Sequence, residues 1–302
     1  MNKWKKITLF TNILLTFSTV FVLLDTFLIP KTYAQAVKVE NTASNTSIDT
    51  NQETSVTENS NIESTITETS YMDDNISITI STIREYETDI YIADVVVSDI
   101  SYLQTALANN QYGRNIKETT STIAENNNAI LAINGDFYGF RDYGFVIRYG
   151  ILYRENGSGE ALVINKDGTF KIVDESSTSA TELLNNNAWQ ALSFGPGLID
   201  NSEIIVGVNE EVGQAMNSNP RTAIGMISPL HYVFIVSDGR TSQSEGLTLY
   251  ELAEVMKDLG VSVGYNLDGG GSSTMYFNGN VVNNPVSKSG ERKVSDIVYI
   301  GY

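Results

Sequence analysis

The chain has 302 residues, 41% of them hydrophobic and 10% aromatic, which is enough for one sizeable hydrophobic core. Its 36 Asp and Glu residues against 19 Lys and Arg give a formal net charge of -17. We therefore predict no nucleic-acid partner, because binding to a phosphate backbone needs clustered cations. The absence of cysteine excludes disulfides, thiolate metal sites and a cysteine nucleophile.

The N-terminus has the features of an export signal. A basic stretch over residues 1–6 precedes an apolar segment over residues 7–29. Small residues follow at Ala34 and Ala36, where a signal peptidase would cut. We predict a signal peptide over residues 1–34 and a secreted or cell-surface location.

The same apolar segment has a second interpretation. It is long enough to cross a bilayer, and would then be an uncleaved membrane anchor. Polar residues and Asp25 interrupt it, which favours the signal peptide. Contact with a membrane is expected only through this segment, if it stays attached.

Residues 35–70 are rich in Asn, Thr, Ser and Glu, with scattered Val and Ile. No helical or alternating pattern persists there, and so few apolar residues cannot offset the entropy lost on ordering. We predict a disordered spacer over this range and one folded domain over residues 71–302.

Most of the folded domain has strand patterns. Residues 76–83 alternate apolar and polar side chains, and the apolar residues 89–97 follow after a charged turn. Further strands are predicted at residues 129–133, 144–153, 161–165, 169–173, 192–199, 220–227, 231–237, 260–265 and 295–300.

Few helices are predicted. Residues 101–108 have a serine cap and a short amphipathic pattern, residues 120–127 give another helix, and residues 247–259 give the clearest, with Thr248 and Glu251 as a capping box. Strands outnumber helices. The fold class is therefore α+β, a β-rich α/β domain with a mixed or antiparallel sheet and a few packed helices.

Residues 266–275, Asn-Leu-Asp-Gly-Gly-Gly-Ser-Ser-Thr-Met, directly follow a predicted buried strand. Three successive glycines are expected where left-handed angles or a close approach to the backbone is needed. Their amides, with the hydroxyls of Ser272, Ser273 and Thr274, would form an anion site. A glycine-rich hairpin capped by Asp268 is the structural alternative.

Four further motifs lie at strand ends: Asn-Gly-Asp-Phe-Tyr at 134–138, Ser-Phe-Gly-Pro at 193–196, Pro-Arg-Thr-Ala-Ile-Gly at 220–225 and Asp-Gly-Arg at 238–240. Together with residues 266–275, and in this order, they resemble the signature of the phosphodiester glycosidase family. The resemblance implies a hydrolase that cleaves between the anomeric carbon of a sugar and a phosphodiester oxygen. The implied partner is a sugar-phosphodiester in an envelope or extracellular glycan.

On this resemblance Asp136 and Asp268 are the catalytic carboxylates, as nucleophile or general base. Their separation would distinguish inversion from retention, and the sequence does not give it. A phosphate leaving group needs donors for its charge more than a strong acid, and Arg221, Arg240 and the glycine amides would supply them. The predicted substrate- and phosphate-binding residues are Asn134, Arg221, Thr222, Asp238, Arg240, Gly269, Gly270, Gly271, Ser272 and Ser273.

Structural roles compete with these assignments. Asp136 would also cap a turn after its strand, and the two arginines would also pair with Asp238 or Glu245. No cofactor is required by the sequence. A divalent cation held by aspartates stays open, although no spaced loop such as an EF-hand is present.

Two other functions are compatible with the sequence. One is a non-catalytic glycan-binding module that uses the same pocket. The other is an ester or amide hydrolase in which Ser272 or Ser273 acts with His231, against which the Gly-x-Ser-x-Gly elbow is absent.

Overall fold

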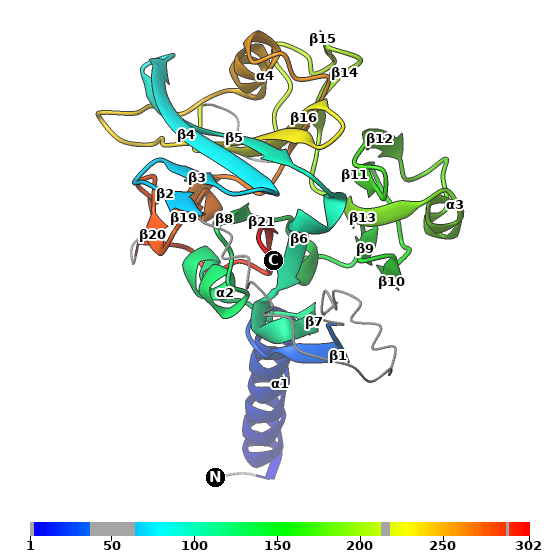
Figure 1. The fold of residues 1–302 in the computed structure, drawn as a ribbon. Helices are drawn as coiled ribbons and strands as arrows, with labels where there is room; N and C mark the ends of the chain where they lie inside the picture. The colour runs from blue at the N-terminus through cyan, green and yellow to red at the C-terminus, as the bar shows by residue number, and fades with distance from the viewer. Residues whose placement is uncertain (1–2, 37–63, 213–217, 288–289) are drawn as a thin grey trace, which may run out of the picture.

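The structure is a computed structural model that describes residues 3–36, 64–212, 218–287 and 290–302 (Figure 1). Its centre is a nine-stranded sheet in which every neighbouring pair of strands is antiparallel. The strand order is β15 (Glu203–Ile204), β14 (Gly197–Asp200), β18 (Val263–Asn266), β16 (Thr222–Ser228), β17 (His231–Ser237), β5 (Thr88–Val97), β4 (Ile76–Glu85), β3 (Ser70–Met72), β2 (Thr65–Ile66).

The two faces of this sheet bury different partners. On one face Ile90, Ile92 and Ile235 pack against the apolar side of helix α4 (Leu249–Asp258). On the other face Ile78 and Phe234 pack against a second sheet. The alternation of side chains along β4, β5 and β17 is what directs successive residues into these two cores.

The second sheet has five antiparallel strands in the order β20 (Asn280–Val281), β19 (Met275–Phe277), β8 (Leu131–Asn134), β21 (Asp296–Ile300), β6 (Leu103–Leu107). Ile133 and Val298 face the central sheet, while Ala132 and Ile297 face helix α2 (Thr120–Asn126). The domain is thus layered as helix, sheet, sheet, helix (Figure 1).

Two smaller sheets complete the described residues. One is β10 (Ile151–Arg154), β9 (Val146–Arg148), β13 (Ala188–Leu192), β11 (Glu160–Asn165) and β12 (Phe170–Asp174), beside helix α3 (Ala180–Asn185). The other pairs β1 (Lys31–Gln35) with β7 (Gln111–Arg114). Helix α1 (Lys3–Phe27) precedes β1, and short 3₁₀ turns are η1 (Ile100–Tyr102), η2 (Ala108–Asn110), η3 (Tyr138–Phe140) and η4 (Gly270–Ser272).

The predicted fold class is confirmed: the chain forms one mixed domain, rich in antiparallel strands, with few helices. Helix α4 carries the predicted capping box, in which Thr248 and Glu251 each accept a bond from the other's backbone. Helix α2 ends one residue before the predicted end.

The predicted helix over residues 101–108 is wrong. A single 3₁₀ turn, η1, is followed by strand β6, which pairs along its whole length with β21. All five residues of β6 are buried, so pairing with a distant strand outweighs the local helical pattern.

The start of the ordered domain also differs from the expectation. Strands β2 and β3 place regular structure at Thr65, inside the predicted spacer, and β1 places a paired strand across its first residue, Gln35. Residues 37–63 lie outside the described residues, so the spacer itself stays a prediction.

Candidate active site

The polar motifs at the strand ends converge on Asn134, the last residue of β8. Its Nδ2 donates to the carbonyl oxygen of Asp268 (2.6 Å). Its Oδ1 accepts from the hydroxyl of Thr222 (2.8 Å) and the amide of Thr274 (3.2 Å). One buried amide side chain therefore joins the ends of β8 and β16 to the glycine segment.

A cleft of about 1020 Å³ opens beside this junction. Asp268, Gly269 and Gly270 lie along it, with cations and amides on the same lining. Aromatic rings from two other motifs supply apolar surface. The aromatic and cationic lining residues are Phe137, Phe140, Tyr143, Phe194, Arg141, Arg221, Arg240 and Arg292.

Asp268 is a buried carboxylate, 8% exposed, on the wall of this cleft. Its Oδ2 accepts from Ser272 Oγ (2.6 Å) and from Arg292 Nη2 (3.0 Å). Burial raises the pKa of Asp268, and Arg292 and Ser272 oppose that rise only in part. The group is thus placed to accept a proton nearer to neutral pH than an ordinary aspartate.

Three amides of the glycine segment that were predicted to bind an anion or lie beside it donate to backbone carbonyls instead. The amide of Gly270 donates to the carbonyl of Pro220 (2.8 Å), and those of Ser272 and Ser273 donate to carbonyls within the triplet. Gly270, at φ +64°, needs the left-handed region, which explains a glycine there. Gly269 and Gly270 line the cleft, whereas Gly271, Ser272 and Ser273 are not part of its lining.

Asp136, predicted to act on the sugar, is not among the residues that line the cleft. It is 1% exposed, and its Oδ1 accepts from the amide of Tyr138 (2.8 Å). Its Oδ2 accepts from the amide of Ser193 (3.1 Å) and from Arg148 Nη2 (3.3 Å). Both oxygens are therefore held within the protein, as in the turn-capping alternative.

Arg148 connects Asp136 to a second buried carboxylate, Asp296 (2.6 Å). Burial and the nearby Asp136 raise the pKa of Asp296 well above its ordinary value. One guanidinium thus sits between two carboxylates, and protonation of Asp296 relieves the excess negative charge.

Thr222 and Asp238 also have structural partners. Thr222 bonds Asn134, as above. Asp238 accepts from the amide (2.9 Å) and the Nδ2 (2.8 Å) of Asn284, and from the hydroxyl of Tyr91 (3.2 Å). Neither lines the cleft.

The two predicted arginines, Arg221 and Arg240, both line the cleft but have different hydrogen-bond partners. Arg221 pairs with Glu211 (2.5 Å), an ion pair that the sequence did not suggest, and also donates to the carbonyl of Leu247. Arg240 donates through Nε and Nη2 to Asn219 Oδ1 (2.8 and 2.6 Å). Across the described residues, no carboxylate forms an ion pair with Arg240.

Several lining residues were missed from the sequence. Arg141 lies 5.1 Å from the ring centre of Tyr143 and 5.7 Å from that of Phe194, and in the described structure its buried Nε and Nη2 have no hydrogen-bond partner. The same holds for Oδ1 of Asn266. Phe194 lies within a recognised motif, whereas nothing around Arg292 marked it in advance.

The alternative sites find little support in the described residues. No group of three or more His, Asp or Glu there is arranged to hold a metal ion. His231 pairs with Asp94 (3.0 Å), with 30% of its side chain exposed, while Ser272 bonds Asp268 and Arg292. A serine–histidine pair is thus not formed among these residues.

Known proteins resemble this chain in sequence and in fold. The family model described as phosphodiester glycosidase matches residues 127–301. An uncharacterized SPbeta prophage-derived protein, YomE of Bacillus subtilis (strain 168), is 31% identical over 200 residues, which cover 63% of this chain and 31% of that protein. The mouse N-acetylglucosamine-1-phosphodiester alpha-N-acetylglucosaminidase is 40% identical over 65 residues, 22% of this chain and 12% of that protein. The chain thus spans less than a third of each of these relatives.

Two solved structures share the fold. The zebrafish N-acetylglucosamine-1-phosphodiester alpha-N-acetylglucosaminidase catalytic domain, auto-inhibited by its pro-peptide, superposes with a TM-score of 0.59 at 24% identity, over 75% of this chain and 83% of that one. A hypothetical protein from Synechocystis superposes with a TM-score of 0.60 at 15% identity, over 75% of this chain and 62% of that one. The residues matched by the family model, 127–301, contain all five motifs and the whole cleft lining, and the chain belongs to the phosphodiester glycosidase family.

Proposed function

We propose that this chain hydrolyses the bond between the anomeric carbon of a sugar and a phosphodiester oxygen, in an envelope or extracellular glycan. The observation that carries the proposal is Asp268, a buried carboxylate with a raised pKa on the wall of a cleft that also holds guanidinium groups. Membership of the phosphodiester glycosidase family supports the reaction class. In the reaction water adds to the sugar, and the other product is a phosphomonoester.

Asp268 is the carboxylate that acts at the anomeric carbon. As a general base it takes a proton from the attacking water, and as a nucleophile it forms a bond to the sugar that water then breaks. The first route inverts the anomeric configuration and the second retains it. Ser272 and Arg292 hold Asp268 in place through hydrogen bonds to its carboxylate.

The phosphate is bound by Arg141 and Arg240, the cleft arginines that form no ion pair with a carboxylate among the described residues. Arg141 has two buried donors without a partner in the described structure, and the guanidinium of Arg240 donates there to the neutral side chain of Asn219. Guanidinium groups bind the non-bridging oxygens of a phosphate through paired hydrogen bonds. They also stabilise the charge that gathers on the leaving phosphate as the bond to the sugar breaks.

The sugar lies against the aromatic part of the cleft. Phe137, Phe140 and Phe194 supply apolar surface for a sugar ring, and Asn266 Oδ1 is a buried acceptor for a sugar hydroxyl. Asp136, by contrast, keeps the loop between β8 and η3 in place through its bonds to Tyr138 and Ser193.

Incubation with a panel of synthetic sugar-1-phosphate methyl diesters tests the proposal. Phosphorus NMR should detect methyl phosphate, and proton NMR of the first product gives its anomeric configuration. Asp268→Asn should slow release by about 10²–10⁴-fold, whereas Asp94→Asn, which changes an exposed carboxylate on β5, should leave it intact. Saturable binding across the panel without any release would favour a non-catalytic glycan-binding module.

A further inference from the structure

The N-terminal helix and the strand that follows it differ in how they meet the domain. Helix α1 stands apart from it except at its C-terminal end, whereas β1 is part of a sheet (Figure 1). We propose that α1 stays attached as a membrane anchor, with a lipid bilayer as its partner, and that β1 fixes the folded domain directly to this anchor. The proposal is independent of the reaction that the cleft performs.

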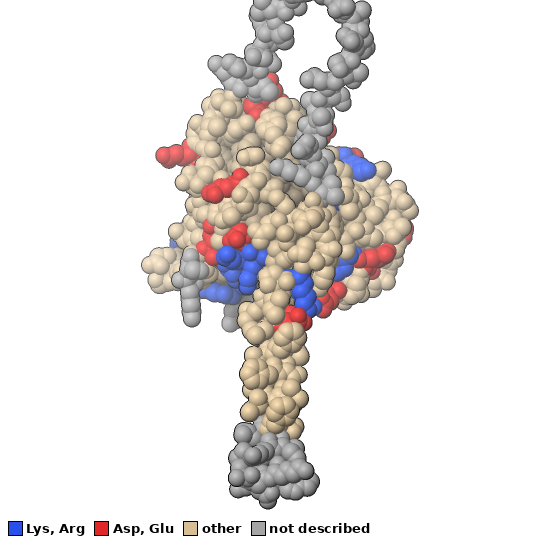
Figure 2. All heavy atoms as spheres, turned by 90° about the horizontal axis from the view of Figure 1, so that it is seen from below, with Lys and Arg blue, Asp and Glu red and all other residues tan. Residues whose placement is uncertain are grey.

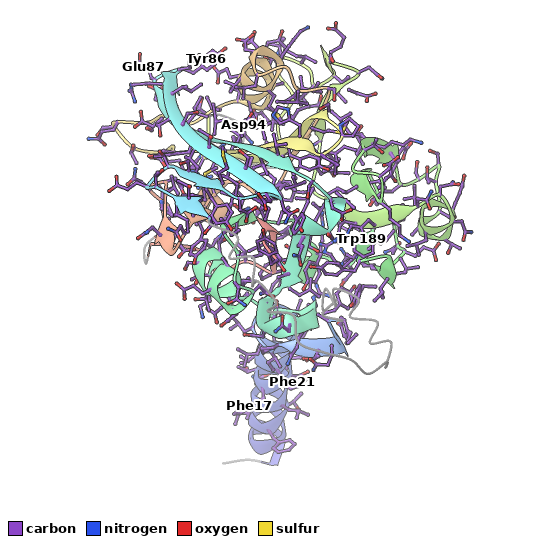
Figure 3. All side chains as sticks on the ribbon, in the orientation of Figure 1. Phe17, Phe21, Tyr86, Glu87, Asp94 and Trp189 are labelled. Atoms are coloured by element: carbon purple, nitrogen blue, oxygen red, sulfur yellow. The ribbon has the colours of Figure 1, made fainter. Side chains whose placement is uncertain are left out.

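Helix α1 has the dimensions and surface of a membrane-spanning helix. The window Phe10–Phe27 has a mean hydropathy of 1.6, and none of it is buried by the rest of the described structure. Phe17 is 71% exposed and Phe21 62%, and Figure 3 shows both projecting from a helix with no neighbour. In Figure 2 the part of this helix that is not grey shows no charged group until it meets the domain, where basic and acidic side chains gather. So large an apolar surface needs a non-aqueous partner.

The ends of the helix suit this placement. The sequence has three lysines within residues 1–6, before the apolar window, which orients the N-terminus toward the cytoplasm and the domain outside. At the other end Asp25 pairs with Lys31 (2.6 Å), which compensates the one acidic residue within the window.

Strand β1 is built into the domain. It pairs with β7 from Lys31 opposite Arg114 to Gln35 opposite Gln111, and the amide of Ala36 donates to the carbonyl of Asn110 (2.8 Å). Ala34 and Ala36 pack against a buried cluster that includes Tyr112.

Two residues of the domain are shaped for the N-terminal segment. A side chain on Gly113 would overlap the carbonyl oxygen of Lys31, so only glycine lets β1 approach. Asn115 donates through Nδ2 to the carbonyls of Thr26 (3.1 Å) and Ile29 (3.2 Å). These carbonyls lie at the C-terminal end of α1, where the helix cannot satisfy them itself.

This contact changes the balance between the two sequence interpretations. Cleavage after Ala34 would cut within β1, and cleavage after Ala36 would remove the whole strand from its partner β7. The anchor also ends next to the cleft, because Arg114 of β7 pairs with Asp142 (2.6 Å), which lies on the cleft lining. A retained α1 therefore holds the cleft beside the membrane surface.

The test uses the full chain, expressed in a bacterium with a C-terminal tag. We expect an intact mass that includes residues 3–36, sedimentation with membranes after alkaline carbonate washing, and release by detergent. A secreted product that begins at Gln35 or Val37 would overturn the proposal.

Trypsin digestion of the detergent-solubilised full chain tests the docking of β1. The bond after Lys31 should be protected, and Gly113→Ala should speed its cleavage about tenfold by displacing the strand. Gly207→Ala is the matched control, because its added carbon would meet only Glu210 at ordinary contact distance (3.6 Å). Asn115→Ala, a milder change, should speed cleavage by a smaller factor. Equal rates in wild type and all three variants would refute the docking.

Discussion

Asp136 and Asp268 each follow the end of a buried strand, β8 and β18, and each pairs with an arginine, yet only Asp268 lines the cleft. Asp136 is 1% exposed, and both of its carboxylate oxygens accept hydrogen bonds from protein donors, among them the buried Arg148. Asp268 is 8% exposed, reaches the cleft, and has a pKa that burial raises.

The difference separates two uses of a buried carboxylate. Where the carboxylate is enclosed and accepts from backbone amides, as Asp136 does, the charge holds the backbone in one conformation. Where the carboxylate borders open space, the same burial makes it a better proton acceptor near neutral pH. Substitutions at the two positions should therefore affect different properties.

The largest effect on stability is expected for Asp136→Asn. The amide group would place N–H where the amide of Tyr138 or of Ser193 needs an acceptor, while Arg148 keeps its shorter ion pair with Asp296. A buried donor left without its acceptor costs about 1–3 kcal/mol. Chemical denaturation should show a loss of this size in the free energy of unfolding. A variant that is as stable as the wild type but inactive would show that Asp136 is catalytic.

Asp268→Asn should show the reverse pattern. We expect kcat to fall by about 10²–10⁴-fold, the range for loss of a general base. A raised folded-state pKa means that the wild type is favoured at acidic pH and loses stability as the pH rises through that pKa. Near neutral pH the neutral asparagine should thus be at least as stable, as thermal unfolding will test. A large drop in melting temperature would show that Asp268 is structural.

The arginines extend the comparison. Arg240→Ala should lower kcat/KM by about 10- to 100-fold, since a hydrogen bond to a charged group contributes about 1.5–3 kcal/mol, with little change in folding. Arg221→Ala should instead lower stability, because it leaves the largely buried carboxylate of Glu211 without its partner. Arg84→Ala, at an exposed ion pair, is the control for both assays. If Arg221→Ala lowers activity and leaves stability unchanged, Arg221 acts on the substrate and its pair with Glu211 does not stabilise the fold.

The pH dependence gives a smaller, graded effect. Since Asp268 must be ionised to act, the acidic limb of kcat/KM should fall at a pH above the ordinary aspartate pKa of about 3.9. Arg292 lowers the pKa of Asp268, so Arg292→Gln should move this limb to higher pH. If the acidic limb of kcat/KM lies at the ordinary aspartate pKa in both the wild type and Arg292→Gln, the ionisation of Asp268 does not control the reaction.

The smallest effect is expected in the glycine triplet. Gly270→Ala would force alanine into the left-handed region and bring its added carbon to 3.2 Å from Arg240 Nη2, at a cost of about 1 kcal/mol or more. Gly271→Ala meets only Arg292, at 3.6 Å, and should be tolerated. Activity and melting temperature of the two variants check the contrast. An equal loss of activity in both variants would indicate that the glycine triplet binds the anion.

The strands and the helix α4 were predictable because alternation and capping are local signals, carried by residues such as Thr248 and Glu251. Strand β6 was not, because its structure depends on pairing with β21, nearly two hundred residues later. Five motifs located the region of the cleft, since they end strands that the sheets bring together.

The roles of individual residues in the cleft were harder to predict from the sequence. Sequence alone does not tell a carboxylate that lines a cleft from one that is enclosed by the protein, so Asp136 and Asp268 could not be distinguished. Arg141 and Arg292 come from loops, where no periodic pattern marks orientation. Their partners, Phe194 and Asp268, belong to other segments and meet them only in the folded chain.

The most direct test of the account is the position of bond cleavage. Hydrolysis of a sugar-1-phosphate methyl diester in ¹⁸O-labelled water should leave the methyl phosphate unlabelled, because water attacks carbon and the phosphate departs with its original oxygens. Phosphorus NMR resolves the isotope shift. Label in the methyl phosphate would mean attack at phosphorus, and would contradict Asp268 as the carboxylate that acts at the sugar.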